Sequence, residues 1–516
     1  MTASTQTEGS GTGPGSSGKG LAKGQLGLFG STIMGLASTA PVYSLVATLG
    51  FVIAEVGAQA PIAFILAFVP MFFIAFAYRE LNRAVPDCGT TFTWATKAFG
   101  PWVGWLGGWG VAVAGIIVLA NLAQIAGLYF WYLVGPLVGA PELADDTWLV
   151  LGTGVFFIAA MVYVSYRGVE IGEKLQNVLL GIQYLALALF VIFAIVGIAD
   201  GTAMEATPVS ADWFNPFGFT DFDGFTAAIL LAIFIYWGWD TCLALNEETK
   251  DPKRIPGRAA LISTLVLVVT YVAVTVAAMA YAGLDNLTDQ DDVFLVVKDA
   301  LFGPWAWLLV LAVMISAISS TQTTILPTAR GTLSMAIYQA LPKRFGSVHP
   351  KYRTPGFSTL VMGVIAIVFY VGMTIVSENF LADSIYSLGL AIAFYYGLTG
   401  FACVWYFRKE LFVNAHSFFF KFLFPLLGAV LLTAAFVKSA IDMLNPDYGY
   451  TILFGVGGVF VIGVGSLLLG VVLAVVWSLF RESRPFFRGE SLNRDTEVLV
   501  PEDDQLIIRS VDGGRG

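Results

Sequence analysis

The chain has 516 residues, of which 57% are hydrophobic and only 12% are charged. A soluble protein of this length needs many more polar residues to cover its surface, so the composition excludes a soluble globular fold. The net charge is −9, and the sequence has no basic stripe of the kind that binds nucleic acid. The three cysteines and two histidines are too scattered for a metal cage or a disulfide framework. We therefore expect a membrane protein without metal or cofactor.

Residues 1–24 are rich in Gly, Ser and Thr, which predicts a disordered cytoplasmic tail and no signal peptide. The following chain contains apolar stretches of about 20 residues or more, the length needed to cross roughly 30 Å of hydrocarbon. They predict an all-α polytopic membrane protein with twelve transmembrane helices. We expect the spans near residues 27–53, 61–78, 101–134, 147–166, 175–199, 225–248, 259–283, 304–328, 356–376, 384–407, 421–441 and 452–480.

Lysine and arginine fall almost entirely on one side of these spans. They lie in both tails and in the loops after the second, fourth, sixth, eighth and tenth spans, whereas only Lys298 and Lys438 lie on the opposite side. Cytoplasmic loops of membrane proteins carry an excess of positive charge. We therefore expect a multi-pass protein of the plasma membrane with both termini in the cytoplasm.

The first span is interrupted between Ser31 and Pro41, where the sequence reads STIMGLASTAP. Pro41 lacks an N–H and crowds the carbonyl four residues back, so the carbonyl of Ala37 should be freed. Unpaired backbone groups survive in a membrane only where they line a cavity. Free N–H groups there favour a carboxylate and freed carbonyls favour a cation. The pattern predicts that residues 35–40 are unwound and that substrate contacts Gly35, Ala37, Ser38 and Thr39.

Polar residues in other spans are further candidates. Asn121 in the third span either contacts substrate or binds a neighbouring helix. Gln183 lies in the fifth span, and Ser319 and Ser320 lie in a hydroxyl-rich stretch of the eighth. Hydroxyls there either bond back to their own helix or offer oxygens to a coupling ion such as Na⁺. We take Gln183, Ser319 and Ser320 as the candidates for the coupling-ion site.

The sixth span carries a second interruption, Phe234 to Thr241, reading FIYWGWDT. It places Gly238 and the carboxylate of Asp240 in the middle of the membrane. An intramembrane carboxylate is energetically costly and is a functional candidate, although protonation or a backbone partner can also accommodate it. The residues predicted here to contact substrate are Phe234, Tyr236, Gly238 and Asp240.

The two interruptions are related by a repeat. Gly35 and Gly238 lie 203 positions apart, and the tetrapeptide FGPW occurs at Phe99–Trp102 and again 203 positions later at Phe302–Trp305. The shared offset predicts two five-helix halves, residues 25–199 and 225–407, with opposite orientations in the membrane. Such halves can rock against each other around a central site. Residues 421–480 then form two accessory helices and residues 481–516 form a cytoplasmic, mostly disordered tail.

Over residues 25–480 the sequence resembles the amino acid–polyamine–organocation permeases. The resemblance rests on the Gly-containing break in the first span, YRELNRAVPDCGTTFTWATKAFGP, GWDTCLALNEETKDPKRIP and LPTARGTLSMAIYQALPKRFGSVHPKYRTP. It implies the leucine-transporter fold of five plus five inverted helices and two more, with substrate held between the breaks. It also implies that Phe234 closes over substrate and that Asp240 matches the acidic position after the second break.

Two positions depart from that family pattern. Many members have a Gly-[Ser/Ala]-Gly run in the first span that cradles the substrate carboxylate, where this chain has Gly35-Leu36-Ala37. The difference weakens the case for an α-carboxylate and leaves amines open. Some proton-coupled members have a Lys in the fifth span, where this chain has Gln183. Because Gln takes up no proton at neutral pH, that coupling route is expected to be absent.

Together these observations favour a secondary active transporter for an amino acid or related organic amine, driven by H⁺ or Na⁺ and making no covalent change to its substrate. A polyamine transporter is one alternative. A nutrient sensor that keeps the transporter fold is another. A membrane enzyme is disfavoured because no nucleophile–base or metal constellation is evident in the sequence.

Overall fold

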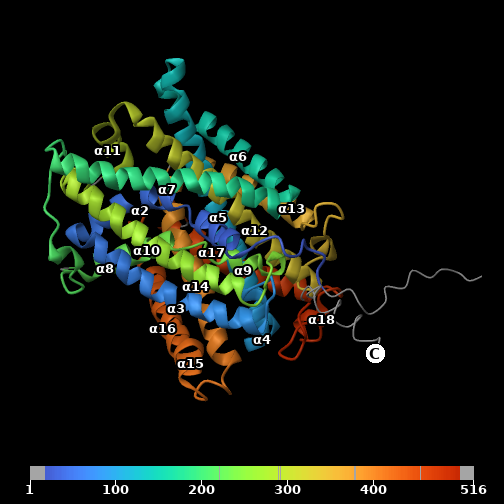
Figure 1. The fold of residues 1–516 in the computed structure, drawn as a ribbon. Helices are drawn as coiled ribbons and strands as arrows, with labels where there is room; N and C mark the ends of the chain where they lie inside the picture. Colours follow the sequence, from blue (N-terminus) through green and yellow to red (C-terminus); the bar gives the residue numbers. More distant parts are fainter. Residues whose placement is uncertain are drawn as a thin grey trace, which may run out of the picture.

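The computed structural model describes residues 18–219, 221–288, 290, 292–376, 379–453 and 455–499. These residues are almost wholly helical, apart from turns and a short hairpin of β1 (Ile452–Leu453) and β2 (Val456–Gly457). The long helices, shown in Figure 1, are α3 (Ala60–Ala84), α5 (Pro101–Val134), α6 (Thr147–Arg167), α7 (Val169–Ala199), α10 (Ile255–Ala282), α12 (Trp307–Ile337), α13 (Gly356–Val376), α14 (Phe380–Tyr406), α16 (Phe424–Asp442) and α17 (Gly458–Ser478). The shorter ones are α1 (Leu28–Thr39), α2 (Pro41–Val56), α4 (Thr91–Phe99), α8 (Phe222–Ile235), α9 (Thr241–Ala244), α11 (Val293–Phe302), α15 (Ala415–Ser417) and α18 (Arg484–Phe487).

Ten helical segments of the described chain are long and apolar enough to cross a membrane. One of them, Leu28–Ala84, contains the first two predicted spans. The sixth predicted span is represented by the shorter apolar helix α8 followed by α9. Helix α5 begins and ends at the residues predicted for the third span. The chain is thus a polytopic helical membrane protein, whereas the count of twelve spans and the inverted repeat stay predictions.

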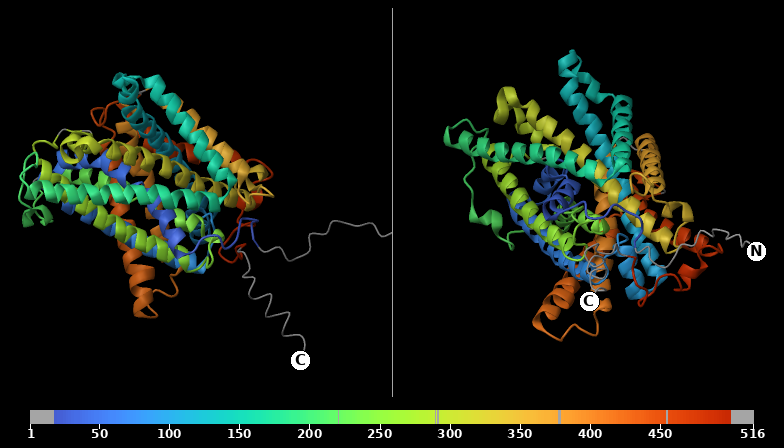
Figure 2. Two further views of the ribbon diagram at one scale, coloured as in Figure 1. Left: turned by 45° about the horizontal axis from the view of Figure 1, so that its top comes forward. Right: turned by 45° about the vertical axis from the view of Figure 1, so that its right-hand side comes forward.

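The interrupted helices lie inside the bundle. Helix α1 packs against α7, α10 and α12, while α2 packs against α8 and α12. Figure 2 shows the blue α1–α2 segment surrounded by helices from the middle of the chain. Helix α16 lies at the edge of the bundle, against α14 and α3. Helices surrounded by protein can carry polar backbone groups that lipid would not tolerate.

Aspartates fix the starts of three helices on the predicted outer face. Asp146 accepts hydrogen bonds from the backbone N–H groups at the start of α6, Asp221 does so for α8, and Asp292 does so for α11. A side-chain acceptor at this position pairs backbone donors that have no partner within the helix. The negative charge also suits the positive end of the helix dipole.

Both tails pack against the bundle more than the sequence predicted. Residues 1–17 and 500–516 lie outside the described residues, but Lys19 and Leu21 are buried, which contradicts a disordered segment through residue 24. In the C-terminal segment, Phe486 and Leu492 are buried beside α5, and Lys97 donates to the carbonyl of Asn493. The composition of these segments is that of linkers, but a few apolar and charged side chains are enough to attach them.

The predicted orientation can be tested with single cysteine substitutions. Glu142 and Asp221 lie on the predicted outer side, and Lys253 and Lys351 lie on the predicted inner side; all four are exposed. We expect an impermeant thiol reagent to label Glu142→Cys and Asp221→Cys in intact cells. Lys253→Cys and Lys351→Cys should react only in inside-out vesicles. Labelling of any of the four from the other side would contradict the assignment of the spans around it.

Candidate functional site

The first break is shorter than predicted and lies later in the chain. Helix α1 continues through Thr39, so residues 35–39 are helical, contrary to the predicted unwinding. The chain bends at Ala40, whose backbone is left-handed with φ 48°, and α2 begins at Pro41. The N–H of Ala40 donates to the carbonyl of Ala37 at 3.2 Å, so the carbonyl predicted to be free is paired. Pro41 takes the first helical position, where its missing N–H costs nothing.

Hydroxyl groups pair the other carbonyls around this bend. Ser320 of α12 donates to the carbonyl of Ser38 at 2.8 Å, and Ser44 of α2 donates to the carbonyl of Thr39 at 2.6 Å. The hydroxyl of Thr39 donates to the carbonyl of Leu36. Ser320, a predicted coupling-ion residue, is therefore placed directly at the first break.

The second break has the predicted position. Helix α8 ends at Ile235 and α9 begins at Thr241, with a turn between them. Gly238 in this turn has φ 109°, a conformation that side chains strongly disfavour. A Cβ atom at this position would lie 2.7 Å from the carbonyl oxygen of Ser38. Glycine is therefore required here for the backbones of the two breaks to meet.

A side-chain hydrogen bond also joins the two breaks. The hydroxyls of Ser38 and Thr241 lie 2.8 Å apart, and these two residues are separated by 203 positions. This separation equals the offset found between the two halves of the sequence. The contact therefore joins residues that correspond in the proposed repeat.

Asp240, at the end of the second break, is held by α14. The hydroxyl of Tyr396 donates to one carboxylate oxygen at 2.9 Å, and that of Tyr395 donates to the other at 3.3 Å. The indole N–H of Trp237 donates to the Tyr395 hydroxyl. Sequence reasoning missed both tyrosines, although their adjacent positions in an apolar span were a usable signal.

An aromatic cluster surrounds this carboxylate. The ring of Trp239 lies 5.1 Å from that of Tyr78 and 5.2 Å from that of Tyr396, measured between centroids. The indole nitrogen of Trp239 is buried and has no hydrogen-bond partner in the described part of the chain. Buried donors are normally paired, so this N–H lacks the hydrogen bond that a buried donor usually makes.

A second polar cluster lies on the other side of the first break. The hydroxyl of Tyr43 donates to Asn121 at 2.5 Å, and the amide nitrogen of Asn121 donates to Ser384 at 2.6 Å. The ring of Phe234 meets that of Tyr43 edge-on, with centroids 6.3 Å apart. The structure thus brings Asn121 and Phe234 together through Tyr43, which sequence reasoning also missed.

The nine residues predicted to contact substrate are all buried, so this region is closed to solvent in the structure. They are Gly35, Ala37, Ser38, Thr39, Asn121, Phe234, Tyr236, Gly238 and Asp240. Gly35 and Tyr236 serve packing in this conformation. A Cβ atom on Gly35 would meet Ser263 of α10 at 2.8 Å, and Tyr236 donates to the carbonyl of Phe64 at 3.0 Å.

The three residues predicted to form a coupling-ion site are not joined by hydrogen bonds. Ser319 donates to Gln176, whose amide nitrogen donates in turn to Gln322 at 2.6 Å. Gln183 lies two turns further along α7, where its amide is buried without a partner among the described residues. The hydroxyl-rich part of α12 therefore faces Gln176, and an ion site that includes Gln183 stays a prediction.

The side of the bundle that carries both described ends is closed by an ion cluster. The ammonium of Lys19 lies 2.6 Å from a carboxylate oxygen of Asp87 and 2.6 Å from one of Glu247, and all three side chains are fully buried. Asp87 also accepts from Ser334 and Tyr338. The cluster ties the N-terminal segment to the α3–α4 loop, to α12 and to the turn after α9.

These charges stabilise one another. Burial alone would lower the pKa of Lys19, but the charge of Asp87, joined by that of Glu247, outweighs burial and holds that pKa well above its usual value. Burial alone would raise the pKa of Asp87, but Lys19 and the hydrogen bonds hold it below its usual value. The pair is therefore ionised at neutral pH. Next to it, Arg330 makes a two-pronged ion pair with Glu248, whose backbone carbonyl accepts from Gln25.

On the opposite side, Tyr129 of α5 donates a hydrogen bond to Asp292 at the start of α11. The same carboxylate caps α11 through the N–H groups of Phe294 and Leu295. This contact fixes the short helix α11 across the bundle end. Contacts between distant elements therefore join the helices at both ends of the bundle.

Replacing Gly238 tests the contact between the breaks. In Gly238→Ala, we expect the strain of positive φ and the clash with Ser38 together to lower the stability of the folded state by ~2–5 kcal/mol. The measurement is thermal unfolding of the purified protein in detergent. Gly57→Ala is the matched control, because Gly57 also has positive φ but a Cβ atom there would meet nothing within 4 Å. Equal losses in the two variants would show that the backbones do not meet at Gly238.

Comparison with known proteins identifies the family of this chain. The chain is 26% identical to the low-affinity putrescine importer PlaP of Escherichia coli (strain K12), over 79% of this chain and 86% of the relative. It is 24% identical to the branched-chain amino acid permease BcaP of Bacillus subtilis (strain 168), over 68% and 75%, and 26% identical to the methylthioribose transporter of the same organism, over 59% and 65%. These relatives are transporters, which indicates transport rather than catalysis. Residues 26–479 match the sequence profile of the amino acid permeases, and the chain therefore belongs to the amino acid permease family.

Proposed function

We propose that this permease carries a zwitterionic amino acid across the plasma membrane by alternating access around the two helix breaks. The observation that carries the proposal is the direct contact of the breaks, Gly238 against Ser38, beside the buried carboxylate of Asp240. Paired discontinuous helices at the centre of a bundle are the typical substrate site of secondary transporters. The contact between Ser38 and Thr241 supports the proposed inverted five-plus-five repeat, because these residues correspond at its offset.

The helix ends at the first break suit a substrate with both charges. The last turn of α1 and the first turn of α2 meet at Ala40, so a negative and a positive helix end lie side by side. An ammonium group favours the former and a carboxylate favours the latter. The unpartnered indole N–H of Trp239 offers a further donor to a substrate oxygen. This combination fits an amino acid better than a diamine.

The hydrogen bonds of Asp240 support the same choice. Both carboxylate oxygens already accept from tyrosine hydroxyls of α14, so the protein itself holds this group. A direct ammonium ligand would need at least one oxygen turned to the substrate. We therefore assign Asp240 to the movement of α14 against the second break, or to proton handling during that movement. The alternative of a polyamine substrate is favoured by the putrescine importer among the relatives.

Uptake into proteoliposomes tests transport itself. With labelled amino acids and putrescine as probes and an imposed H⁺ or Na⁺ gradient, we expect accumulation of an amino acid above its outside concentration. Binding without accumulation would identify a sensor instead. Accumulation of putrescine alone would identify a polyamine transporter.

The role of Asp240 is tested by Asp240→Asn. We expect substrate affinity to change less than about threefold and the rate of substrate counterflow to fall at least tenfold, because the carboxylate acts on α14 and not on the ligand. Affinity is measured by titration calorimetry and exchange by counterflow. Tyr396→Phe, which removes one donor to the same carboxylate, should lower the same rate. A loss of ~2–5 kcal/mol in affinity with intact exchange would show a direct ammonium partner and a cationic substrate.

Opening of the proposed cytoplasmic side requires Lys19 to leave its two carboxylates. Removing one partner of a buried ion pair costs ~3–5 kcal/mol, so Lys19→Ala should favour the open form. Cys88 is a native reporter, because its buried thiol lies 3.7 Å from the Lys19 ammonium. We expect Lys19→Ala to raise the rate of Cys88 labelling in inside-out vesicles at least tenfold, as measured by peptide mass mapping.

Lys23→Ala is the control for this experiment, since Lys23 lies in the same segment but is exposed. It should leave the labelling rate of Cys88 at the wild-type value. An unchanged rate in Lys19→Ala, or an equal increase in both variants, would show that the ion cluster does not hold this side closed.

A further inference from the structure

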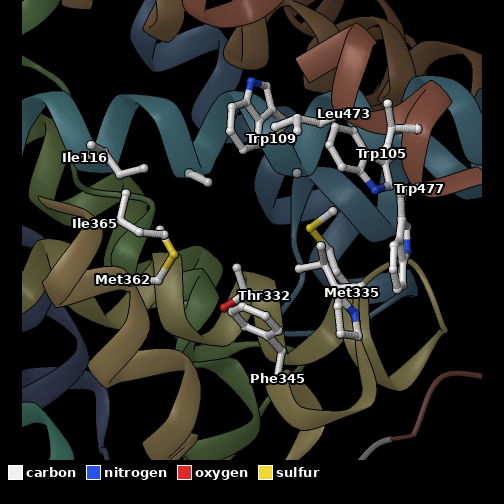
Figure 3. A pocket seen from close by; sticks show the side chains of 15 residues that line it. Trp105, Trp109, Ile116, Thr332, Met335, Phe345, Met362, Ile365, Leu473 and Trp477 are labelled. Atoms are coloured by element: carbon white, nitrogen blue, oxygen red, sulfur yellow. The ribbon is translucent and has the colours of Figure 1, made fainter. Parts of the chain in front are cut away.

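An apolar cavity lies outside the region of the helix breaks. It has a volume of about 290 Å³ and is bounded by α5, α12, α13, α17 and the loop after α12 (Figure 3). Aromatic and sulfur-containing side chains dominate its walls: Trp105, Trp109, Met335, Phe345, Met362 and Trp477. None of the nine residues predicted to contact substrate lines it. The cavity is therefore distinct from the region of the helix breaks.

The cavity faces the outside of the helix bundle. Of its lining residues, Ile365 is 41% exposed, Leu473 is 36% exposed and Val476 is 48% exposed. All three lie on helices long and apolar enough to cross the membrane, so their surroundings are the lipid tails. A ligand reaches such a cavity from within the bilayer, which requires a long apolar chain.

One tryptophan in the cavity wall has an indole N–H without a hydrogen-bond partner in the described chain. The indole N–H of Trp105 donates to the carbonyl of Ala340 at 3.0 Å, and that of Trp109 donates to the carbonyl of Ser466 at 2.8 Å. The indole nitrogen of Trp477 is buried but has no partner among the described residues. An unmade bond of this kind in a buried site costs free energy. A ligand with an oxygen acceptor near its apolar chain would remove that cost.

Positively charged residues lie close in sequence to the residues of the cavity wall, on the membrane face where both described ends of the chain lie. Lys343 and Arg344 stand between the lining residues Pro342 and Phe345 and are exposed. Arg481 follows Trp477 by four positions and is also exposed. Lys343, Arg344 and Arg481 form no ion pair within the described chain, although Glu482 is next to Arg481 in the sequence. Clusters of Lys and Arg next to membrane helices attract anionic headgroups.

We propose that this cavity binds an anionic phospholipid of the leaflet on that face. One acyl chain fills the space between the tryptophans, an ester or phosphate oxygen accepts from Trp477, and the phosphate lies near Lys343, Arg344 and Arg481. The apolar cavity, the unpaired indole N–H and the exposed cations match three parts of one molecule, namely a hydrocarbon tail, a polar acceptor and a negative headgroup. A membrane phospholipid carries all three in that order.

The test is native mass spectrometry of the delipidated full-length protein with phosphatidylglycerol or phosphatidylcholine that have the same acyl chains. We expect phosphatidylglycerol to bind at least tenfold more tightly. In the triple variant Lys343→Gln, Arg344→Gln, Arg481→Gln this preference should fall below threefold. The matched control is Lys253→Gln, Arg254→Gln, which removes exposed cations from the same predicted face away from the cavity and should keep the preference.

A second variant tests the acyl chain. Ala112 lines the cavity, so Ala112→Leu should fill part of it and weaken the binding of both lipids at least fivefold. A monodisperse elution profile and an unchanged melting temperature would confirm that this variant is folded. Equal binding of the two lipids to the wild type, or a full preference in the triple variant, would overturn the proposal. So would competition by soluble glycerol phosphate at the concentration of the lipid, since this would mean that the cations bind phosphate without the cavity.

Discussion

The close approach of two interrupted helices is the constraint on which the rest of the structure depends. Hydrocarbon offers no hydrogen bonds, so backbone groups released by a helix break must be paired by protein. Here hydroxyls from neighbouring helices provide the partners. Ser320 reaches the carbonyl of Ser38, Ser44 reaches that of Thr39, and Tyr271 of α10 reaches that of Ile235 at 2.7 Å. Ser320 in the polar stretch of α12 is thus explained by the break that it supports, whereas Ser319 of the same stretch meets Gln176 of α7.

The pairing makes the two breaks sensitive to movement of the surrounding helices. Asp240 is the one charged residue between Phe234 and Thr241, and its carboxylate is held by two tyrosines of α14. Tyr43, at the start of α2, is linked through Asn121 of α5 to Ser384 of α14. Helix α14 therefore contacts the second break directly and is linked to Tyr43, near the first break, through Asn121. A change in the hydrogen bonding of either cluster would therefore act on the same helix.

The two ends of the bundle are held together by different physical means. On the side of the described chain ends a fully buried ammonium from the N-terminal segment pairs with two carboxylates that would otherwise repel each other. On the other side a neutral tyrosine donates to the aspartate that also caps α11. The first contact involves the N-terminal segment, and the second involves a short helix within the bundle.

The sequence by itself determined the features that depend on neighbouring residues. The apolar stretches defined the spans, because helix rise and hydrophobic thickness set a minimum length of about 20 residues. Both ends of the longer helix α5 were marked locally, by Pro101 at its start and Gly135 after its end. The second break was evident from Gly238 and Asp240, since both residues disfavour a continuous membrane helix wherever they pack. The family resemblance followed from motifs that are continuous in the chain and is confirmed by the match over residues 26–479.

Only the tertiary structure decided features whose partners are distant in the chain. The first break moved to Ala40 because the hydroxyls of other helices and the bond to Ala37 keep the preceding turn helical. Lys19 appeared to belong to a solvated tail, but its two carboxylate partners are 68 and 228 positions away. Gln176 and Gln183 share one buried face of α7, and Gln176 meets Ser319 because of its height along the helix relative to α12. Local sequence fixes where a helix can form or break, whereas the partners of a buried polar group are set by helix packing, which no local pattern encodes.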